Sequence, residues 1–157
     1  MHAKNTCFWL MKSEPSSYSI DDFKKEGATF WEGVRNYQAR NFMIHNMKLG
    51  DSILFYHSNA KPSGVVGLGI VSKHASPDQT ALDKKSKYFD PKATQAKPRW
   101  FAVTVKFRKK FPQILTLEQL RKEKSLKNML LLKKGQRLSI LPVTKKEFEH
   151  IIGLTKK

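Results

Sequence analysis

The chain has 157 residues, of which 39% are hydrophobic and 11% are aromatic, and its formal net charge is +17. This length and apolar content favour one domain over residues 1–157 with a buried core, and they exclude general disorder. The single cysteine, Cys7, excludes an internal disulfide and a cysteine-rich zinc site. The sequence contains no run of about 18 apolar residues, the length needed to cross a membrane. We therefore expect a cytoplasmic protein, or a nuclear one in a eukaryote.

The positive charge is concentrated in the second half of the chain. Residues 84–157 carry 21 basic and 5 acidic side chains, against 9 and 8 in residues 1–83. Ten of these basic residues lie between Lys84 and Lys110, where Asp90 is the only acid. Such a segment is typical of a surface that binds a polyanion, either nucleic acid or an acidic membrane. No basic amphipathic helix is evident, which disfavours the membrane, and a general adaptation of surface charge is the remaining alternative.

A strand and a short helix are predicted at the start of the chain. The apolar run over 7–11 is typical of a buried strand, and a turn before Pro15 ends it. Ser19 precedes a segment with two acids in its first turn, which predicts a capped helix over 20–25. Gly27 is expected to end that helix.

A second helix is predicted to follow Asn36, whose side chain is suited to cap it. Apolar residues recur at three- and four-residue offsets over 37–47, as on one face of a helix, and Gly50 follows. The pattern then changes to the alternation that is typical of strands. Three strands are predicted, over 52–58, 64–72 and 100–107.

The segment 73–98, between the second and third of these strands, is rich in Lys, Ser, Asp and Pro and predicts a long exposed loop. Three elements follow: a helix through Lys122 capped by Thr116, a strand over 137–141, and a helix over 145–152 whose capping box pairs Thr144 with Glu147. This order predicts an α+β fold, with helices around a mixed, strongly curved sheet or small barrel.

Motifs of catalysis and metal binding are missing. The sequence has no Gly-x-Ser-x-Gly elbow, Walker loop or His-Glu-x-x-His pair, and its five histidines are dispersed. We therefore expect no catalytic residues, no metal and no cofactor. His57 and Ser58 are not interpreted as a catalytic pair, because neighbouring strand residues point to opposite faces. Gly67 and Gly69 share one face of a predicted strand, where they permit strong curvature or the close approach of a flat ligand.

Candidate recognition residues gather in the segment 30–41, FWEGVRNYQARN. It places Trp31, Arg35 and Arg40 around the predicted start of a helix, whose free N–H groups suit phosphate. Trp31 can stack on a nucleobase or fill the core beside the helix, and the sequence leaves both open. Trp9 lies in the middle of an apolar strand and is assigned to the core.

Five sequence blocks, in order over about residues 8–152, resemble the signature of the EVE domain family. They are WLMKSEP from Trp9, FWEGVRNYQAR from Phe30, FYHSN from Phe55, PRW from Pro98 and RLS from Arg137. The resemblance implies a PUA-like fold, a curved mixed sheet or pseudo-barrel flanked by short helices. It also implies that the chain binds nucleic acid through an extruded modified base, as the related YTH and SRA domains do.

The resemblance implies that Lys12 and Ser13, at the end of the first strand, hydrogen-bond the base edge. It also implies that Trp31 corresponds to a cage tryptophan of the YTH pattern. The other cage aromatics of that pattern have no counterpart. The base pocket is thus predicted from Lys12, Ser13, Trp31, Arg35, Asn36, Tyr37, Tyr56, His57, Ser58, Arg99 and Trp100. Contacts to the phosphate backbone are predicted from Arg40, Lys106, Arg108, Lys109 and Lys110.

These residues predict a non-catalytic, monomeric reader of RNA or DNA. Basic side chains hold the phosphate backbone by salt-sensitive contacts, while one base of a single-stranded or locally unpaired segment enters the pocket. Two other functions stay open. One is an enzyme that acts on nucleotides or RNA, with His57 or Glu14 as acid or base. The other is an accessory protein of RNA or the ribosome that has no base pocket.

Overall fold

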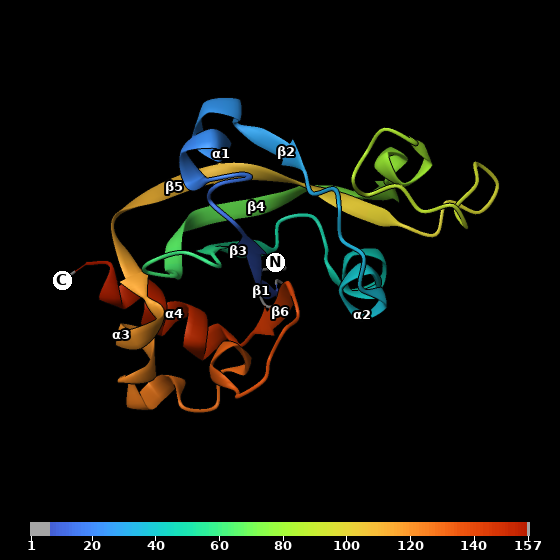
Figure 1. Ribbon diagram of the computed structural model, residues 1–157. Helices are drawn as coiled ribbons and strands as arrows, with labels where there is room; N and C mark the ends of the chain where they lie inside the picture. Colours follow the sequence, from blue (N-terminus) through green and yellow to red (C-terminus); the bar gives the residue numbers. More distant parts are fainter. Residues whose placement is uncertain (1–6, 157) are drawn as a thin grey trace.

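Six strands form one mixed sheet in the order β2–β5–β4–β3–β1–β6. The computed structural model describes residues 7–156, and Figure 1 shows the long β4 and β5 crossing the molecule side by side. β1 runs parallel to β3, and the other described pairs are antiparallel. The strands are β1 (Phe8–Ser13), β2 (Ala28–Phe30), β3 (Ser52–His57), β4 (Gly64–Pro77), β5 (Phe101–Thr116) and β6 (Ile140–Val143).

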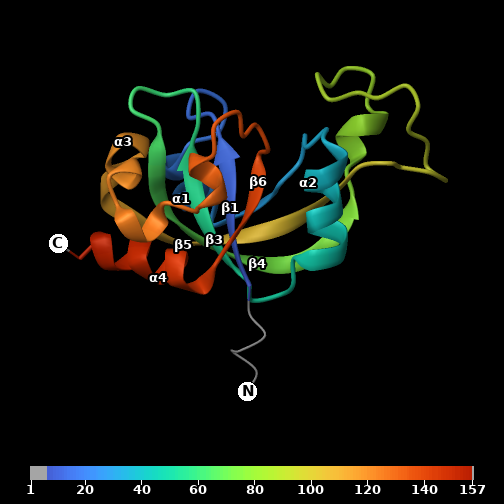
Figure 2. The ribbon, with the colours of Figure 1, turned by 90° about the horizontal axis from the view of Figure 1, so that it is seen from below.

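Short helices lie on both sides of this sheet. Figure 1 shows α1 above it and α3 and α4 below it, and Figure 2 shows α2 at the end of the sheet away from α3 and α4. The helices are α1 (Ile20–Glu26), α2 (Tyr37–Asn41), α3 (Leu117–Arg121) and α4 (Lys145–Leu154). The α+β class with a mixed, PUA-like sheet and short flanking helices is thus confirmed.

Alternation along the strands divides the apolar residues between two cores. Trp9 on β1 and Phe55 on β3 belong to a first cluster, which packs beneath α1 and α2. Leu10 and Tyr56, their neighbours in sequence, belong to a second cluster, which packs between the sheet and the helices α3 and α4. Successive side chains of a strand point to opposite faces, so each central strand serves both cores. Trp9 is 4% exposed, which confirms its assignment to the core.

The helix starts predicted from the sequence are confirmed. Each cap accepts a hydrogen bond from the backbone N–H three residues later, and three of the four also form a reciprocal capping box. These side chains satisfy N–H groups that have no partner within the helix. The caps are Ser19 of α1, Asn36 of α2, Thr116 of α3 and Thr144 of α4.

Several predicted boundaries are wrong. The helix expected over 37–47 ends at Asn41 and continues as a π-helical turn, Phe42–Asn46. β2 was absent from the sequence prediction, because three residues are too few to show an alternating pattern. The last strand begins at Ile140 instead of residue 137, where β6 starts its pairing with β1.

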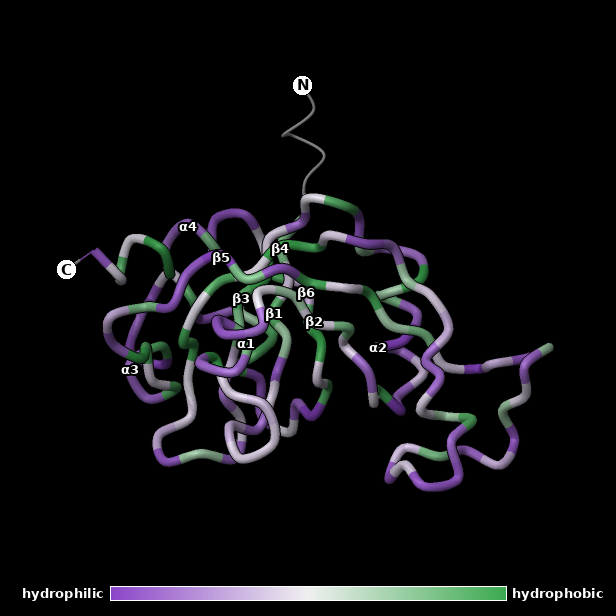
Figure 3. The backbone as a smooth tube through the Cα atoms, turned by 90° about the horizontal axis from the view of Figure 1, so that it is seen from above, coloured by the Kyte–Doolittle hydropathy of each residue, from purple (hydrophilic) through white to green (hydrophobic). Residues whose placement is uncertain are grey.

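The segment 73–98 was predicted as a loop too polar to bury, and part of it is neither loop nor exposed. β4 extends to Pro77 and β5 begins at Phe101. The paired ends of these strands and the segment 78–100 between them form an arm, residues 73–101, that projects from the sheet (Figure 1). Figure 3 shows hydrophilic residues interrupted by a few hydrophobic ones along this arm. Within the arm a small buried cluster forms around Trp100, and the carboxylate of Asp78 is buried beside it. Those few apolar residues anchor an otherwise polar segment.

The glycine pair of β4 serves packing within the fold. A Cβ atom on Gly67 would lie 2.4 Å from the carbonyl oxygen of Lys109 on β5 and 2.6 Å from Ile20 Cδ1 on α1. A Cβ on Gly69 would lie 3.1 Å from the ring of Phe23, also on α1. The space over both glycines is therefore taken by β5 and α1, and a flat ligand has no access there.

Candidate functional site

A cavity of about 690 Å³ opens where β1 ends and where the chain leaves β2 toward α2. Ligand pockets typically range from about 300 to 1,000 Å³, so this cavity is large enough for a nucleobase. Its wall comes from β1, α1, β2 and the tip of the arm, segments that lie far apart in the sequence. The lining residues are Lys12, Ser13, Glu14, Ser17, Tyr18, Glu26, Thr29, Phe30, Trp31, Glu32, Gly33, Val34, Arg35, Lys87, Tyr88 and Ser139.

Trp31 is held firmly in the wall of this cavity. Its backbone N–H donates to the carbonyl oxygen of Val103 on β5 at 2.9 Å, and its indole meets the ring of Phe55 edge to face at 5.6 Å. The residue is 8% exposed. Trp31 belongs to the first core, as one of the two sequence-based interpretations expected, and it also lines the cavity. Stacking on a nucleobase stays a prediction.

Gly33 allows the ring of Tyr88, another aromatic residue of the cavity wall, to pack directly against the backbone that follows β2. Its φ of +88° is a conformation that residues with a Cβ avoid, and a Cβ there would lie 2.6 Å from the Tyr88 ring. Tyr88 comes from the arm, so the close approach joins the arm to the segment that follows β2. A glycine is therefore required at this point of the cavity wall.

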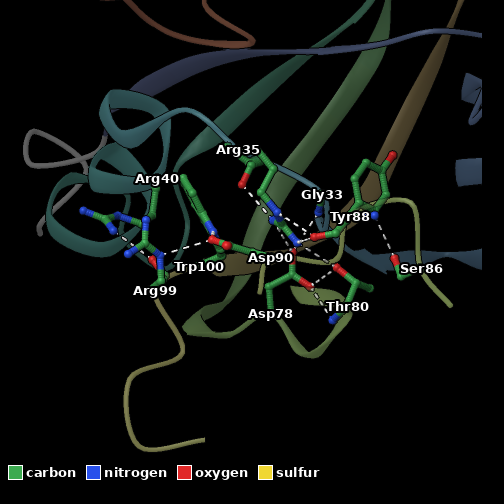
Figure 4. Close-up of polar contacts among 11 residues, drawn as sticks. Gly33, Arg35, Arg40, Asp78, Thr80, Ser86, Tyr88, Asp90, Arg99 and Trp100 are labelled. Carbon is green, nitrogen blue, oxygen red and sulfur yellow. Dashed lines mark hydrogen bonds and ion pairs between the residues drawn. The ribbon is translucent and has the colours of Figure 1, made fainter. Parts of the chain in front are cut away.

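The buried carboxylate of Asp78 fixes both sides of this junction (Figure 4). It accepts hydrogen bonds from Gly33 N at 2.8 Å and from Arg35 Nη1 at 3.1 Å. Thr80 donates to the other oxygen through its backbone N–H and its hydroxyl. Burial alone would raise the pKa of Asp78, but these hydrogen bonds outweigh it and lower that pKa below the usual value.

Arg35 connects Asp78 to Tyr88. Its Nε and Nη2 atoms donate to the carbonyl oxygen of Tyr88 at 3.0 and 2.8 Å, and Nη2 also donates to the hydroxyl of Thr80. Phosphate binding was one sequence-based interpretation of this arginine. Its guanidinium is instead occupied by the ion pair with Asp78 and by the arm, so Arg35 shapes the cavity wall.

Charged groups of both signs surround the cavity. Burial lowers the pKa of Lys12, while burial and the nearby charge of Asp78 raise the pKa of Glu32. The hydroxyl of Tyr18 donates to Glu26 at 2.6 Å, and burial together with this bond raises the pKa of Tyr18 to about 12. Three glutamates line the cavity together with Lys12, Arg35 and Lys87, so the wall has no excess of positive charge and suits a polar but uncharged group such as a base edge.

The comparison with protein families agrees with this geometry. The EVE domain model matches residues 7–154, which include all elements of the sheet and the whole cavity wall. The chain belongs to the EVE domain family.

Several proteins are similar to this EVE domain over most of its length. It is 41% identical to thymocyte nuclear protein 1 of Gallus gallus, over 94% of this chain and 68% of that protein. A hypothetical protein from Leishmania major has a solved structure with 46% identity and a TM-score of 0.93, covering 99% of this chain and 98% of that one. Human THYN1 protein, solved in complex with 5-methylcytosine-containing DNA, is 39% identical with a TM-score of 0.90, covering 97% and 99%.

Four residues predicted for the base pocket line the cavity of this EVE domain: Lys12, Ser13, Trp31 and Arg35. The side chain of Ser13 donates to the carbonyl oxygen of Tyr18 at 2.6 Å, which fixes the turn after β1. The prediction from the EVE resemblance that the end of the first strand borders the pocket agrees with this placement.

Four others lie elsewhere for identifiable reasons. Asn36 is occupied in capping α2, and Tyr56 points into the second core, on the opposite face of β3 from Phe55. His57 accepts a hydrogen bond from the backbone N–H of Ile20 at 3.1 Å and so supports the start of α1. Ser58 follows β3 and donates its backbone N–H to Ser13.

Tyr37, Arg99 and Trp100 gather in a separate cluster outside the cavity lining, together with Arg40. Asp90 accepts from Trp100 Nε1 at 2.7 Å and from Arg99 Nε at 3.1 Å, and Arg40 Nη1 donates to the carbonyl oxygen of Arg99. The sequence analysis therefore assigned residues of two separate places, the cavity and this cluster, to one pocket, because both lie near the start of α2.

The predicted phosphate contacts of β5 are exposed, and the first of them lies beside β2, the strand that leads to the cavity. Lys106, Arg108, Lys109 and Lys110 are all solvent-exposed, and Lys106 pairs with Ala28 of β2. Lys110 forms an ion pair with Asp21 at 2.7 Å between two exposed side chains. The other three have no carboxylate within 4.0 Å among the described residues.

Sequence reasoning missed the contribution of the arm to the cavity. Lys87 and Tyr88 come from the segment treated as a loop, and Ser139 comes from the residue just before β6. The adjacent aromatic residues Tyr88 and Phe89 within a polar segment were the available signal, because such rings need a surface to pack against.

Within residues 7–156, no group of three or more His, Cys, Asp or Glu side chains could hold a metal ion. None of the helices in the same range is long and apolar enough to pass through a bilayer. Of the two residues considered for acid–base chemistry, Glu14 lines the cavity and His57 does not. The arrangement thus provides a ligand-sized cavity with aromatic residues in its wall.

Proposed function

We propose that this EVE domain binds DNA that carries a modified base, and that it holds the base in the cavity beside Trp31. The observation that carries the proposal is the similarity to human THYN1 protein, which was solved in complex with 5-methylcytosine-containing DNA. The similarity covers 97% of the chain. A base must leave its stack to enter such a cavity, which costs least in single-stranded or unpaired DNA.

The aromatic walls support this function. Trp31 and Tyr88 border one cavity, and stacking of a base on an aromatic ring contributes about 1–3 kcal/mol. Both residues are held by contacts to the fold. The backbone of Trp31 bonds to β5 and its indole packs on Phe55, while Arg35 donates to the carbonyl oxygen of Tyr88 and lies 5.6 Å from its ring centre. A wall that is fixed before binding loses little conformational entropy when the base arrives.

The indole N–H of Trp31 supports it further. Trp9 and Trp100 donate their indole N–H groups to carboxylates, whereas Trp31 Nε1 has no acceptor among the described residues. No fully buried side-chain nitrogen or oxygen in this part of the chain lacks a partner, so Trp31 Nε1 is accessible. We assign it as a donor to the ligand, since a tryptophan this deeply set usually finds an acceptor.

The charges fit the same division of roles. The cavity wall contains the carboxylates of Glu14, Glu26 and Glu32, while Lys106, Arg108 and Lys109 stand exposed on β5. The base enters the mixed-charge cavity, and the phosphates contact the basic strand. The proposed function is non-catalytic, so DNA recovered after incubation with the protein is expected to keep its intact mass.

Binding to single-stranded 12-mers tests the proposal. Two otherwise identical oligonucleotides carry either one 5-methylcytosine or one cytosine, and affinity is measured by fluorescence anisotropy at a stated salt concentration. We expect the wild-type protein to prefer the methylated strand. Trp31→Ala should abolish that preference, because it removes both the stacking surface and the free N–H.

Trp31→Phe is the matched control, since it keeps a flat ring and loses only the N–H donor. It should fall between the wild type and Trp31→Ala. Thermal unfolding monitored by circular dichroism must show that both variants remain folded. A Trp31→Ala protein that is folded and still prefers the methylated strand would falsify the pocket assignment. A stronger preference for an RNA strand of the same sequence would move the proposal from DNA to RNA.

The expected location follows from the relatives. The name thymocyte nuclear protein 1 refers to the nucleus, which fits the nuclear half of the sequence-based expectation and gives no support to the cytoplasmic half.

A further inference from the structure

A row of stacked groups leads outward from the cavity. The guanidinium of Arg35 lies 5.6 Å from the ring centre of Tyr88, which lines the cavity, and 5.3 Å from that of Trp100. Trp100 in turn stacks on Tyr37 with the ring centres 4.9 Å apart and the planes 21° from parallel. Figure 4 shows Arg35 between Tyr88 and Trp100. Tyr37 thus forms the outer end of a row that begins at the base pocket.

Tyr37 is unusually exposed for such a residue. It is 49% exposed, and only it and Leu49 are exposed among the large hydrophobic residues that the structure describes. One face of its ring is covered by Trp100. An aromatic ring that is stacked on one face and open on the other is a surface on which a further flat group can stack.

Two arginines flank the ring and leave that outer face open. The guanidinium of Arg40 lies 4.6 Å from the centre of Tyr37 and 5.7 Å from that of Trp100. With the two rings 4.9 Å apart, these distances place Arg40 beside the pair, because a group over the outer face of Tyr37 would lie much farther from Trp100. Arg99 bonds to the Tyr37 hydroxyl, and its guanidinium lies 5.8 Å from the ring centre, farther out than that of Arg40.

The cluster is rigidly supported. Asp90 accepts hydrogen bonds from the indole of Trp100 and from Arg99, and Arg40 holds the carbonyl oxygen of Arg99 at 2.8 Å. Arg99 has a φ of +64°, which is uncommon for a residue other than glycine. Backbone in such a conformation persists only where its surroundings enforce it, and it is concentrated at functional sites.

The charge of Arg40 is available to a ligand. Its guanidinium donates to neutral oxygens, the side-chain oxygen of Asn41 and the carbonyl oxygen of Arg99. No carboxylate lies within 4.0 Å of it among the described residues, whereas Arg35 and Arg99 are paired with Asp78 and Asp90, so the positive charge of Arg40 is not neutralised. An unpaired arginine beside an open aromatic ring is the combination with which proteins bind single-stranded nucleic acid, the ring taking a base and the cation its phosphate.

We propose that Tyr37 is a second stacking platform, which takes the base adjacent to the one held in the cavity, with Arg40 on the phosphate between them. This inference rests on the proposed function and adds a second subsite to it. The platform contributes affinity for a strand of any sequence, because every base has a face that can stack. Selectivity for the modified base stays with the cavity.

Two substitutions separate the platform from the pocket. Tyr37→Ala should weaken binding of both 12-mers, with 5-methylcytosine or with cytosine, by about 5- to 150-fold, the range that corresponds to one lost stacking contact. The ratio between the two affinities should stay at the wild-type value. Tyr37→Phe keeps the ring and should bind like the wild type. Trp31→Ala behaves in the opposite way and loses the ratio.

Photocrosslinking locates the contact directly. A 5-iodouracil is placed on either side of the 5-methylcytosine, the complex is irradiated, and the crosslinked peptide is identified by mass spectrometry. We expect a crosslink to Tyr37 from one of the two positions and none in the Tyr37→Ala protein.

Three outcomes overturn the platform. They are unchanged affinity of Tyr37→Ala, collapse of the affinity ratio in that variant, which would assign Tyr37 to the pocket, and a crosslink that avoids Tyr37 at both positions. A wild-type protein that binds none of the strands overturns the proposed function together with the platform. Failure of the platform alone leaves the Trp31 result intact, so the two failures are distinguishable.

Discussion

The cavity depends on a few residues whose role is to hold others in place. Asp78 joins Gly33 to Arg35, and Arg35 joins both to the carbonyl oxygen of Tyr88. Removing one partner of such a buried network leaves the others without hydrogen bonds, which costs more than the bond itself contributes. The aromatic wall of the cavity is therefore a property of this network as much as of the rings.

Gly33→Ala tests that dependence. The new Cβ would lie 2.6 to 2.8 Å from three atoms of the Tyr88 ring, so the ring must swing away from the cavity wall. The positive φ adds a conformational cost of about 1–2 kcal/mol. We expect a similar loss in the free energy of unfolding in urea, together with about tenfold weaker binding of the 5-methylcytosine 12-mer if one stacking contact is lost.

Gly50→Ala is the control for Gly33→Ala. Gly50 has a φ of +90°, and a Cβ added there would meet no other atom within 4 Å, so the substitution carries the same backbone cost without touching the cavity. Its stability should fall by a similar amount while its affinity for DNA stays unchanged. If both variants lose affinity equally, general destabilisation explains the effect and the contact between Gly33 and Tyr88 does not.

At the scale of elements, local signals predicted more than long-range ones did. The four helix caps were identified because each depends on residues three positions apart, such as Ser19 and Asp22. The extent of β4 and β5 could not be predicted, because polar residues such as Lys109 are retained in a strand by pairing with its neighbour. For the site, Trp31 was found from its type, and Tyr88 was missed because the arm brings it there from 57 positions away in sequence.

The junction between β3 and α1 is sensitive to pH through His57. Its Nε2 accepts the N–H of Ile20, which only a neutral imidazole can do. Burial lowers the pKa of His57 from 6.5, and the charge of Lys110 adds to this, while Asp21 opposes it. The folded state thus favours the neutral ring, so its stabilisation is fully present above pH 6.5 and is lost as the pH falls through the lowered pKa.

His57→Gln removes this dependence, because an amide oxygen of similar reach accepts the same N–H without titrating. We expect urea unfolding of the wild type to show a loss of stability between pH 7 and pH 5 that is larger than the loss in His57→Gln. The other histidines are the same in both proteins, so their contributions cancel in the difference. Parallel curves for the two proteins over this range would contradict the role given to His57.

At the scale of the whole molecule, the net charge of +17 is distributed over more than one surface. Lys106 is exposed on β5 opposite Ala28 of β2, the strand that leads to the cavity, and the exposed Arg108 and Lys109 follow it along β5. A second set of exposed lysines lies around α3 and the turns that follow it, below the sheet in Figure 1. Composition cannot tell which set meets the phosphates, but position relative to the cavity favours the first.

Neutralising each set in turn decides the matter. The β5 variant changes Lys106, Arg108, Lys109 and Lys110 to glutamine, and the control changes Lys122, Lys124, Lys127 and Lys134, so both lose four charges. Each phosphate contact contributes about 0.7 to the slope of log affinity against log salt concentration for single strands. Because Lys110 is paired with Asp21, the β5 variant should lower the slope by about 2, from three contacts, and weaken methylated and unmethylated strands alike. The control should keep nearly the wild-type slope, since its lysines lie away from the cavity. An equal decrease of the slope in the two variants would show that the positive charge attracts DNA over the whole surface, and it would contradict specific phosphate contacts along β5.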